Sequence, residues 1–305
     1  MISTNGNAVG GTVGTLNSIR KLIREIKPDQ LIMCWDGIGG SQKRRTVVKE
    51  YKQGRKPLRK NYKIEGMSEQ SEKENMIWQQ QILMEILNEM PVIQLVLDYV
   101  EADDIVAMIT TSPRYNGWQK VIVSSDKDFL QLLDEETVLY RPIQNKVWNK
   151  NTVIEEYGIS PENFVIARAI AGDNSDNLRG IPGAGLKTVA KRLEFLKEED
   201  FHPINKVLEY CEASESNIKF YKNIVEEWDV VVKNYGVMNL TPPSISAQGS
   251  QKINYALDNF EPELNATGLR TASVEHGFGS YDWSEFIAML RGVIEKNKLA
   301  PATIS

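Results

Sequence analysis

Short apolar runs in this chain end in acidic residues, and this pattern constrains the fold more than any other. Three acidic clusters lie in the middle of the chain, and a further apolar run ends in a single aspartate. The eight carboxylates are those of Asp36, Glu101, Asp103, Asp104, Asp126, Asp128, Asp173 and Asp176. Folding gathers so many like charges only if cations neutralise them, and Mg²⁺ binds through one or two carboxylates while keeping several waters. The clusters therefore predict a two-metal site for phosphate chemistry.

Apolar spacing predicts alternating strands and helices over the first half of the chain. Apolar residues at helical spacing indicate helices over 13–26, 76–90 and 105–110. Short apolar runs indicate strands over 30–35, 92–97, 121–124 and 137–141. Such alternation is typical of an α/β fold with a parallel-rich central sheet flanked by helices, in which ligands bind at the carboxyl ends of the strands. The acidic clusters lie at those ends, so the fold and the chemistry agree.

The second half of the chain is predicted to be mainly helical. Helices are expected over 152–157, 161–171 and 186–196, and a final amphipathic helix over 283–295. Residues 241–251 are polar and are interpreted as a linker. We therefore divide the chain into an α/β core over 1–150, a helical subdomain over 151–240, and a linker with a helical tail of unknown role over 241–305.

Composition restricts the class of protein. Of 305 residues, 41% are apolar and 25% are charged, as in ordinary globular proteins. No stretch approaches 18 uninterrupted apolar residues and residues 1–11 lack a signal-peptide pattern, so we expect no membrane partner and a cytoplasmic location. Two cysteines, Cys34 and Cys211, are too few for a disulfide framework. Because no histidine or cysteine lies near the three clusters, Mg²⁺ or Mn²⁺ is favoured over zinc.

A basic segment over residues 41–63 contrasts with the acidic remainder. Ten Lys or Arg residues stand against the single acid Glu50, so the segment carries +9 in a chain of net charge −5, and the remainder carries −14. A basic stripe beside an acidic metal pocket attracts a polyanion. Tyr51, Lys52 and Arg55 place an aromatic ring and two cations together, as in proteins that hold nucleic-acid strands by stacking. The segment lacks a clean apolar face, which predicts a partly helical, mobile excursion.

A glycine-rich turn, Gly180-Ile-Pro-Gly183-Ala-Gly185, follows the third acidic cluster. Its glycines let the backbone turn tightly, and the helix that follows presents free N–H groups. Such a turn can accept a phosphate. Positive charge is added by Lys187, Lys191 and Arg192.

Each of these features also has a simpler interpretation. Aspartates at a helix start stabilise the helix dipole without any metal. A charge run is usually a solvated face, and a glycine-rich turn fits a plain helix–turn–helix corner. The placement of three clusters and Asp36 at strand ends favours the metal interpretation. The acids just upstream of the glycine-rich turn favour the phosphate interpretation of that turn.

Taken in order, these motifs resemble the 5′-nuclease family, which includes phage flap endonucleases and the 5′→3′ exonuclease domain of bacterial DNA polymerase I. The resemblance runs from about Asn5 to Leu240. It rests on Trp35-Asp36-Gly37, Tyr51-Lys52-Gln-Gly-Arg55, Glu101-Ala-Asp103-Asp104, Ser125-Asp126-Lys-Asp128, and Gly172-Asp173-Asn-Ser-Asp176-Asn177 followed by the glycine-rich turn. It implies a PIN-like nuclease core at 1–150 with a helical arch at 37–75. It also implies a helix–three-turn–helix within 151–240 that grips duplex DNA.

The resemblance also implies roles for individual residues. The first metal would be held by Asp36, Glu101, Asp103 and Asp104. The second metal would be served by Asp126, Asp128, Asp173 and Asp176. From the arch, Lys52 would stabilise charge on the scissile phosphate and Arg55 would position it. The glycine-rich turn would track the duplex backbone and can hold a K⁺ ion. DNA contacts would come from Lys43, Arg44, Arg45, Tyr51, Gly183, Gly185, Lys187, Lys191 and Arg192.

One departure from the family pattern concerns the N-terminus. Family members begin with an apolar strand that ends in a metal-binding Asp, upstream of the region that corresponds to Asn5-Gly6. This sequence starts after that strand, so we expect it to lack one central strand and one carboxylate. Three explanations stay open: an upstream start, a split or degraded gene, or a variant that binds without cutting.

The leading hypothesis is a monomeric, structure-specific 5′ nuclease with two Mg²⁺ ions, for which Mn²⁺ can substitute. It would cleave 5′ flaps and 5′ ends of DNA, or RNA–DNA primers, beside replication proteins in a phage-like setting. The alternative is a branched-DNA-binding protein with incomplete metal ligation. A Mg²⁺-dependent phosphatase fits less well, because Asp36-Gly-Ile38 lacks the required D-x-D arrangement. Asp126-Lys-Asp128 has it, but the basic stripe and the glycine-rich turn would then have no role.

Overall fold

The chain folds into two compact units, each assembled from separate stretches of sequence. The computed structural model describes residues 1–53, 68–279 and 281–299. Unit 1 comprises Met1–Cys34, Lys56–Leu95 and Gln251–Ile304, and unit 2 comprises Trp35–Arg55 and Val96–Ser250. The predicted divisions at residues 150 and 240 follow the order of the sequence and stay predictions.

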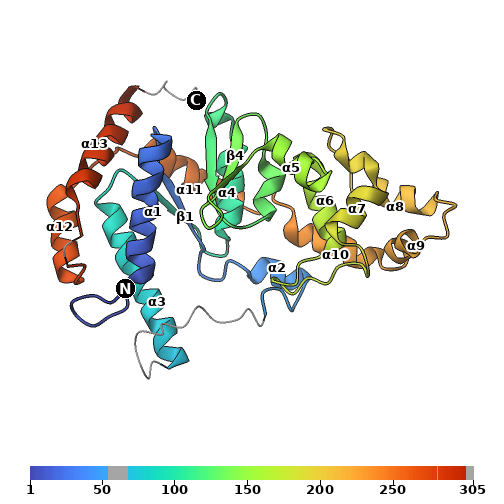
Figure 1. Cartoon of the computed structure of the whole chain (residues 1–305), viewed down its shortest axis with the longest axis horizontal. Helices are drawn as coiled ribbons and strands as arrows, with labels where there is room; N and C mark the ends of the chain where they lie inside the picture. The colour runs from blue at the N-terminus through green and yellow to red at the C-terminus, as the bar shows by residue number, and fades with distance from the viewer. Residues whose placement is uncertain (54–67, 280, 300–305) are drawn as a thin grey trace. The chain divides into compact units, whose positions relative to one another are not determined.

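Helices lying side by side form most of the described part of unit 1 (Figure 1). They are α1 (Gly10–Ile26), α3 (Glu69–Asn88), α12 (Ala266–Glu275) and α13 (Ser284–Leu299). Helix α1 contacts both α3 and α13, and α3 contacts α12. One stripe of α1, made of Val13, Leu16, Ile19 and Ile23, is buried, as its three- and four-residue spacing predicts. The helices predicted over 13–26, 76–90 and 283–295 are confirmed, although α3 begins earlier than expected.

The strands divide between two small sheets. In one, β1 (Ile32–Trp35) pairs with β2 (Ile93–Val96). In the other, β4 (Thr137–Arg141) lies between β3 (Lys120–Val123), which is parallel to it, and β5 (Lys146–Trp148), which is antiparallel. The predicted strands and the mixed α/β class are confirmed. The hairpin to β5 was not predicted, because three residues with one buried side chain give too short an apolar pattern.

Unit 2 packs its helices and turns around one central helix. Its helices are α2 (Gln42–Val47), α4 (Ala102–Thr110), α5 (Lys150–Tyr157), α6 (Pro161–Ala171), α7 (Leu186–Arg192), α8 (Asn205–Glu212), α9 (Lys219–Glu226) and α10 (Trp228–Met238). Its 3₁₀ turns are η1 (Pro113–Tyr115), η2 (Asp128–Leu132) and η3 (Glu194–Lys197). Helix α6 contacts α10, η2 and α7, and its Phe164, Ile166 and Ile170 are fully buried. This apolar packing fixes the elements that carry the acidic residues.

Several predicted elements differ in extent from the observed ones. The helix expected over 186–196 is interrupted at Leu193, whose backbone (φ −120°, ψ 66°) leaves the helical region before η3 begins. The linker expected over 241–251 ends earlier, because α11 (Ala247–Asp258) starts within it. Of the predicted arch over 37–75, α2 and the start of α3 are helical, and residues 54–67 lie outside the described residues. In the described part of the chain, no helix is both long and apolar enough to span a membrane.

Candidate active site

All eight predicted acidic residues belong to unit 2, and each lies at the end of an element or in a turn. Asp36 follows β1 directly, and Glu101 is the N-terminal cap residue of α4, with Asp103 and Asp104 in the first turn of that helix. Asp126 lies between β3 and η2, and Asp128 is the first residue of η2. Asp173 and Asp176 lie in the turn after α6, which the bridge between Asp173 and Leu178 closes. The predicted placement at element ends therefore holds.

Glu101 and Asp104 are buried and share cationic partners from the basic segment. The Arg44 guanidinium, carried by α2, contacts the Glu101 carboxylate and lies 3.1 Å from Asp104 Oδ2. Lys52 contacts the second oxygen of Glu101. Burial alone would raise the pKa of Glu101, but the Arg44 and Lys52 charges hold it below its ordinary value. The Glu101 carboxylate can therefore stay buried and ionised because these cations stand beside it.

Arg44 is itself held firmly in place. Its Nε donates a hydrogen bond to the carbonyl oxygen of Val237 in α10, at 2.9 Å. Burial would lower the pKa of the guanidinium, but Asp104 and Glu101 raise it above its ordinary value. A second bond fixes Asp104, whose Oδ1 accepts from the backbone N–H of Ser244 at 2.8 Å. The ion pairs thus join α2 to the start of α4, and the two hydrogen bonds tie this pair of elements to α10 and to the segment after it.

Asp103 lies in a different electrostatic environment from its neighbours in α4. Burial raises its pKa to about 7, Lys52 partly offsets this, and the negative charge of Asp126 adds to it. A carboxyl group that is protonated near neutral pH without metal is poised to exchange its proton for a cation. The negative charge of Asp126 acts on Asp103, so the first and second acidic clusters influence each other electrostatically.

A third cation, Arg168 of α6, neutralises the remaining acids. Its Nε donates to Asp128 Oδ1 at 3.0 Å, and its Nη2 contacts Asp173. Burial raises the pKa of Asp128 to about 6 despite Arg168, and Asp126 adds to the effect. For Asp173, burial is outweighed by hydrogen bonds from Ser175 and by Arg168, which lower its pKa. The sequence analysis did not identify Arg168. The pattern that could have revealed it is a single cation within the apolar run from Phe164 to Ala171.

The two remaining acids, Asp36 and Asp176, are bonded to the backbone of neighbouring site segments. Asp36 is exposed, and its Oδ1 accepts a hydrogen bond from the backbone N–H of Ala102 at 2.8 Å. Asp176 is buried, and its carbonyl oxygen accepts from the backbone N–H of Lys52 at 2.9 Å. Lys52 has a positive φ of 56°, a strained conformation for a residue with a side chain. A strained backbone thus presents the Lys52 ammonium to the acidic residues.

The donor set fits hard divalent cations in its chemistry, since it consists of carboxylates. Within the described residues, however, no three Asp, Glu, His or Cys side chains are arranged to hold a metal ion. Three cations are instead paired with these acids: Arg44 with Glu101 and Asp104, Lys52 with Glu101, and Arg168 with Asp128 and Asp173.

The residues predicted to contact DNA are divided between the surface and the core. Lys43, Arg45, Lys187 and Lys191 are exposed, and Arg192 is partly exposed. Gly183 and Gly185 are exposed too, and Gly183 has a positive φ of 76° that its turn requires. Arg44 and Tyr51 are buried, and the Tyr51 hydroxyl donates to Glu101 at 3.4 Å. Arg55 lies outside the described residues. These DNA-binding roles stay predictions.

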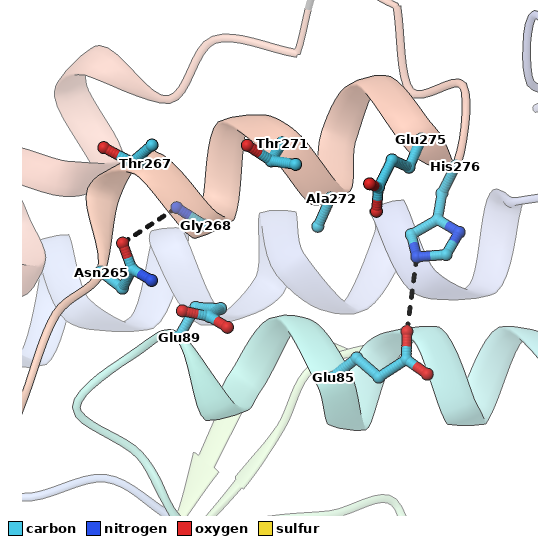
Figure 2. A pocket seen from close by; sticks show the side chains of 9 residues that line it. All are labelled: Glu85, Glu89, Asn265, Thr267, Gly268, Thr271, Ala272, Glu275 and His276. Atoms are coloured by element: carbon cyan, nitrogen blue, oxygen red, sulfur yellow. Dashed lines mark hydrogen bonds and ion pairs between the residues drawn. The ribbon is translucent and has the colours of Figure 1, made fainter.

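A separate pocket of about 380 Å³ lies in unit 1, between α3 and α12. Figure 2 shows Glu85 of α3 and Glu89, the C-cap residue of α3, facing α12, with Glu85 paired with His276 at 3.4 Å. The Asn265 side chain caps α12 by accepting from the Gly268 N–H at 3.0 Å. None of the predicted site residues lines this pocket, so it is distinct from the acidic site.

Comparison with known families decides what the acidic site belongs to. The family model described as "5′-3′ exonuclease, N-terminal resolvase-like domain" matches residues 1–158, more than half of the chain. The chain belongs to the 5′-3′ exonuclease family. A 5′-3′ exonuclease of Buchnera aphidicola is 30% identical over 189 residues, which are 61% of this chain and 60% of the relative. The flap endonuclease Xni of Psychromonas ingrahamii is 30% identical over 219 residues, covering 69% and 77% of the two chains.

Solved structures agree with this family in fold. The 5′-exonuclease of phage T5 with bound zinc ions matches with a TM-score of 0.61 at 17% identity, over 87% of this chain and 89% of that chain. A T5 flap endonuclease in a complex with DNA and metal ions matches with the same TM-score at 16% identity, over 92% and 91%. The resemblance seen in the motifs is thereby confirmed. The chain nevertheless spans only 60% of the length of the Buchnera exonuclease.

Replacement of Arg44 tests the buried ion pairs. We expect Arg44→Met to lower the free energy of unfolding by about 3–5 kcal/mol, because it removes the cation paired with the buried Asp104 and leaves Glu101 with Lys52 alone. Urea unfolding measures this, with Lys43→Met, an exposed neighbour on the same helix, as the matched control. Equal unfolding free energies for the two variants would contradict the assignment.

The raised pKa of Asp103 predicts a pH-dependent effect on metal-free stability. A carboxyl group whose pKa is raised to about 7 by folding destabilises the folded state as pH rises from about 4 to 7. Asp103→Asn removes that cost, so in EDTA the variant should melt higher than wild type at pH 8 and near wild type at pH 4.5. The exposed Asp29→Asn is the control. A lower melting temperature for Asp103→Asn at pH 8 would be the opposite result.

Proposed function

We propose that this chain is a metal-dependent 5′ nuclease that hydrolyses phosphodiester bonds of DNA at 5′ ends and 5′ flaps. The single observation that carries the proposal is the set of family carboxylates in unit 2, which Arg44, Lys52 and Arg168 neutralise in the metal-free state. Membership of the 5′-3′ exonuclease family supports the reaction class, and a relative co-crystallised with DNA and metal ions supports the substrate class.

The metal ligands are proposed to be the carboxylates identified above. Asp36, Glu101, Asp103 and Asp104 would serve one ion; Asp126, Asp128, Asp173 and Asp176 would serve the other. Two divalent ions, Mg²⁺ with Mn²⁺ as a substitute, would supply an activated water and stabilise the leaving oxygen. Asp103 and Asp128 give up the protons that burial favours, which leaves them anionic in the loaded site.

Lys52 is proposed to act on the substrate directly. The Lys52 ammonium is paired with the Glu101 carboxylate. A divalent ion bound by that carboxylate would displace the ammonium. Once displaced, it can donate to a phosphate oxygen as negative charge develops there. Arg55, three residues on, is proposed to position the same phosphate. Arg44 is proposed to have a different role from Lys52. Its buried hydrogen bond to Val237 holds the side chain away from the substrate, so Arg44 would orient Glu101 and Asp104.

The glycine-rich turn and the start of α7 are proposed to track the duplex backbone. Lys187 and Lys191 are exposed on α7, in the same unit as the acidic site, so they can neutralise phosphates away from the cleaved bond. Further proposals concern a K⁺ ion at this turn, RNA–DNA hybrids as substrates, and replication proteins as partners. A monomer in the cytoplasm is the proposed working state.

A flap-cleavage assay tests the nuclease. Wild type should cleave a 5′-flap DNA in Mg²⁺ or Mn²⁺ and lose all activity in EDTA. Asp103→Asn should be inactive, although it is expected to fold more stably than wild type at pH 8. Lys52→Ala should cut about 10²-fold more slowly while binding the flap as wild type does, because its charge acts as the bond breaks. Asp29→Asn is the control for both variants, and full activity of Asp103→Asn would overturn the metal assignment.

A branched-DNA-binding protein is the second candidate. It is favoured by one observation: in the described residues, cations are paired with the carboxylates and no three ligand side chains are arranged to hold a metal ion. This alternative predicts tight flap binding by wild type without cleavage in either metal. Cleavage that Asp103→Asn abolishes would exclude it.

A further inference from the structure

Tyr99, beside the acidic site, is held in an unusual backbone conformation. Its φ is 63°, in the left-handed region that side chains disfavour and glycine adopts freely. The residue is also 63% exposed, so burial in a hydrophobic core does not compensate for this strain. Strained residues persist where the surrounding structure over-determines them, and such sites are often functional. An exposed aromatic ring in such a conformation therefore calls for a role outside the hydrophobic core.

The surrounding structure that imposes this conformation is a pair of loops in unit 2. Residues 37–40 follow Asp36, and residues 97–100 precede Glu101. The Gly37 N–H donates to the Val100 carbonyl oxygen at 3.0 Å, and the Tyr99 N–H donates to the Ile38 carbonyl oxygen at 2.9 Å. A side chain at Gly37 would begin 1.7 Å from the Leu97 carbonyl oxygen, so only glycine permits this approach. Backbone hydrogen bonds and this close approach thus join the two loops into one layer.

This layer presents an apolar surface next to charged residues. The Tyr99 ring lies against Gly39: a Cβ added to Gly39 would lie 2.9 Å from Cδ1 of Tyr99. On the same layer, Ile38 is 82% exposed. Each residue is two positions from a site carboxylate, Asp36 or Glu101, and the Asp36 carboxylate is bonded to the α4 N-terminus beside Glu101. The apolar pair is therefore continuous with the acidic site.

We infer that Tyr99, supported by Ile38, forms a stacking platform for a nucleobase of the DNA next to the cleaved phosphodiester. The inference rests on the proposed nuclease function and adds a positioning residue to it. A substrate at the carboxylates brings its bases to the adjoining surface, and an aromatic face stacks on any base without reading its sequence. The joined loop pair fixes the ring before binding, so that little conformational freedom is lost on stacking. The platform orients the nucleotide, and Lys52 acts on its phosphate.

Substitution of Tyr99 separates this role from a structural one. Tyr99→Gly removes the ring and relieves the strained φ, so the protein should melt at or above the wild-type temperature. It should nevertheless bind 5′-flap DNA about tenfold more weakly, as expected from the loss of one stacked base. Tyr99→Phe keeps the ring and should match wild type. Tyr99→Asn, whose side chain tolerates positive φ, should behave like Tyr99→Gly.

Binding is measured in Ca²⁺ with a flap carrying 2-aminopurine beside the scissile phosphate, and cleavage is measured in single turnovers in Mg²⁺. Wild type and Tyr99→Phe should quench the fluorescence on binding, whereas Tyr99→Gly should not. The control is Tyr255→Ala, which removes a 70% exposed ring from unit 1 and should leave both readouts unchanged. Equal binding and quenching by Tyr99→Gly and wild type would overturn the platform and leave the nuclease standing. Failure of wild type to bind or cut DNA would overturn both.

Discussion

The buried negative charge of Glu101 and Asp104 is the constraint on which the rest of unit 2 depends. Burying carboxylates is costly without cations, and the basic segment supplies Arg44 from α2 and Lys52 from the strained turn that follows, while Arg168 of α6 serves Asp128 and Asp173 in the same way. Each ion pair is therefore also a tertiary contact that places one segment against another. The buried acids therefore determine which segments of unit 2 pack against one another.

The same constraint links the acids to the proposed chemistry. The chain's own cations neutralise several of the acids, and the raised pKa values of Asp103 and Asp128 favour their protonated forms, which lessens the remaining repulsion. Divalent ions would replace those protons and free the Lys52 ammonium for a phosphate. Arg44 would stay, because it is anchored to Val237. In the proposed nuclease, substrate and metal would draw on one set of charges, with the apolar layer of Ile38 and Tyr99 at its edge.

The sequence predicted much of the local structure, because apolar periodicity and charge placement are local signals. Strand β4 and helix α6 have the predicted bounds, and every acidic residue lies at an element end or in a turn. Three features were not predicted. Arg168 pairs with acids 40 and 5 residues away, a pairing that sequence spacing does not encode. Arg44 and Tyr51 belong to a charge run that reads as solvated, yet both are buried because Glu101 is buried. The Tyr99 conformation depends on a loop more than 50 residues away in the chain.

The most direct test of the account is a crystal structure of the protein soaked in Mn²⁺, with anomalous scattering used to locate the ions. The account predicts Mn²⁺ peaks coordinated by Asp103 and its carboxylate neighbours. It also predicts Lys52 displaced from Glu101, with Arg44 still bonded to Val237. No Mn²⁺ peak at these carboxylates, with Lys52 still paired with Glu101 at saturating metal, would contradict it.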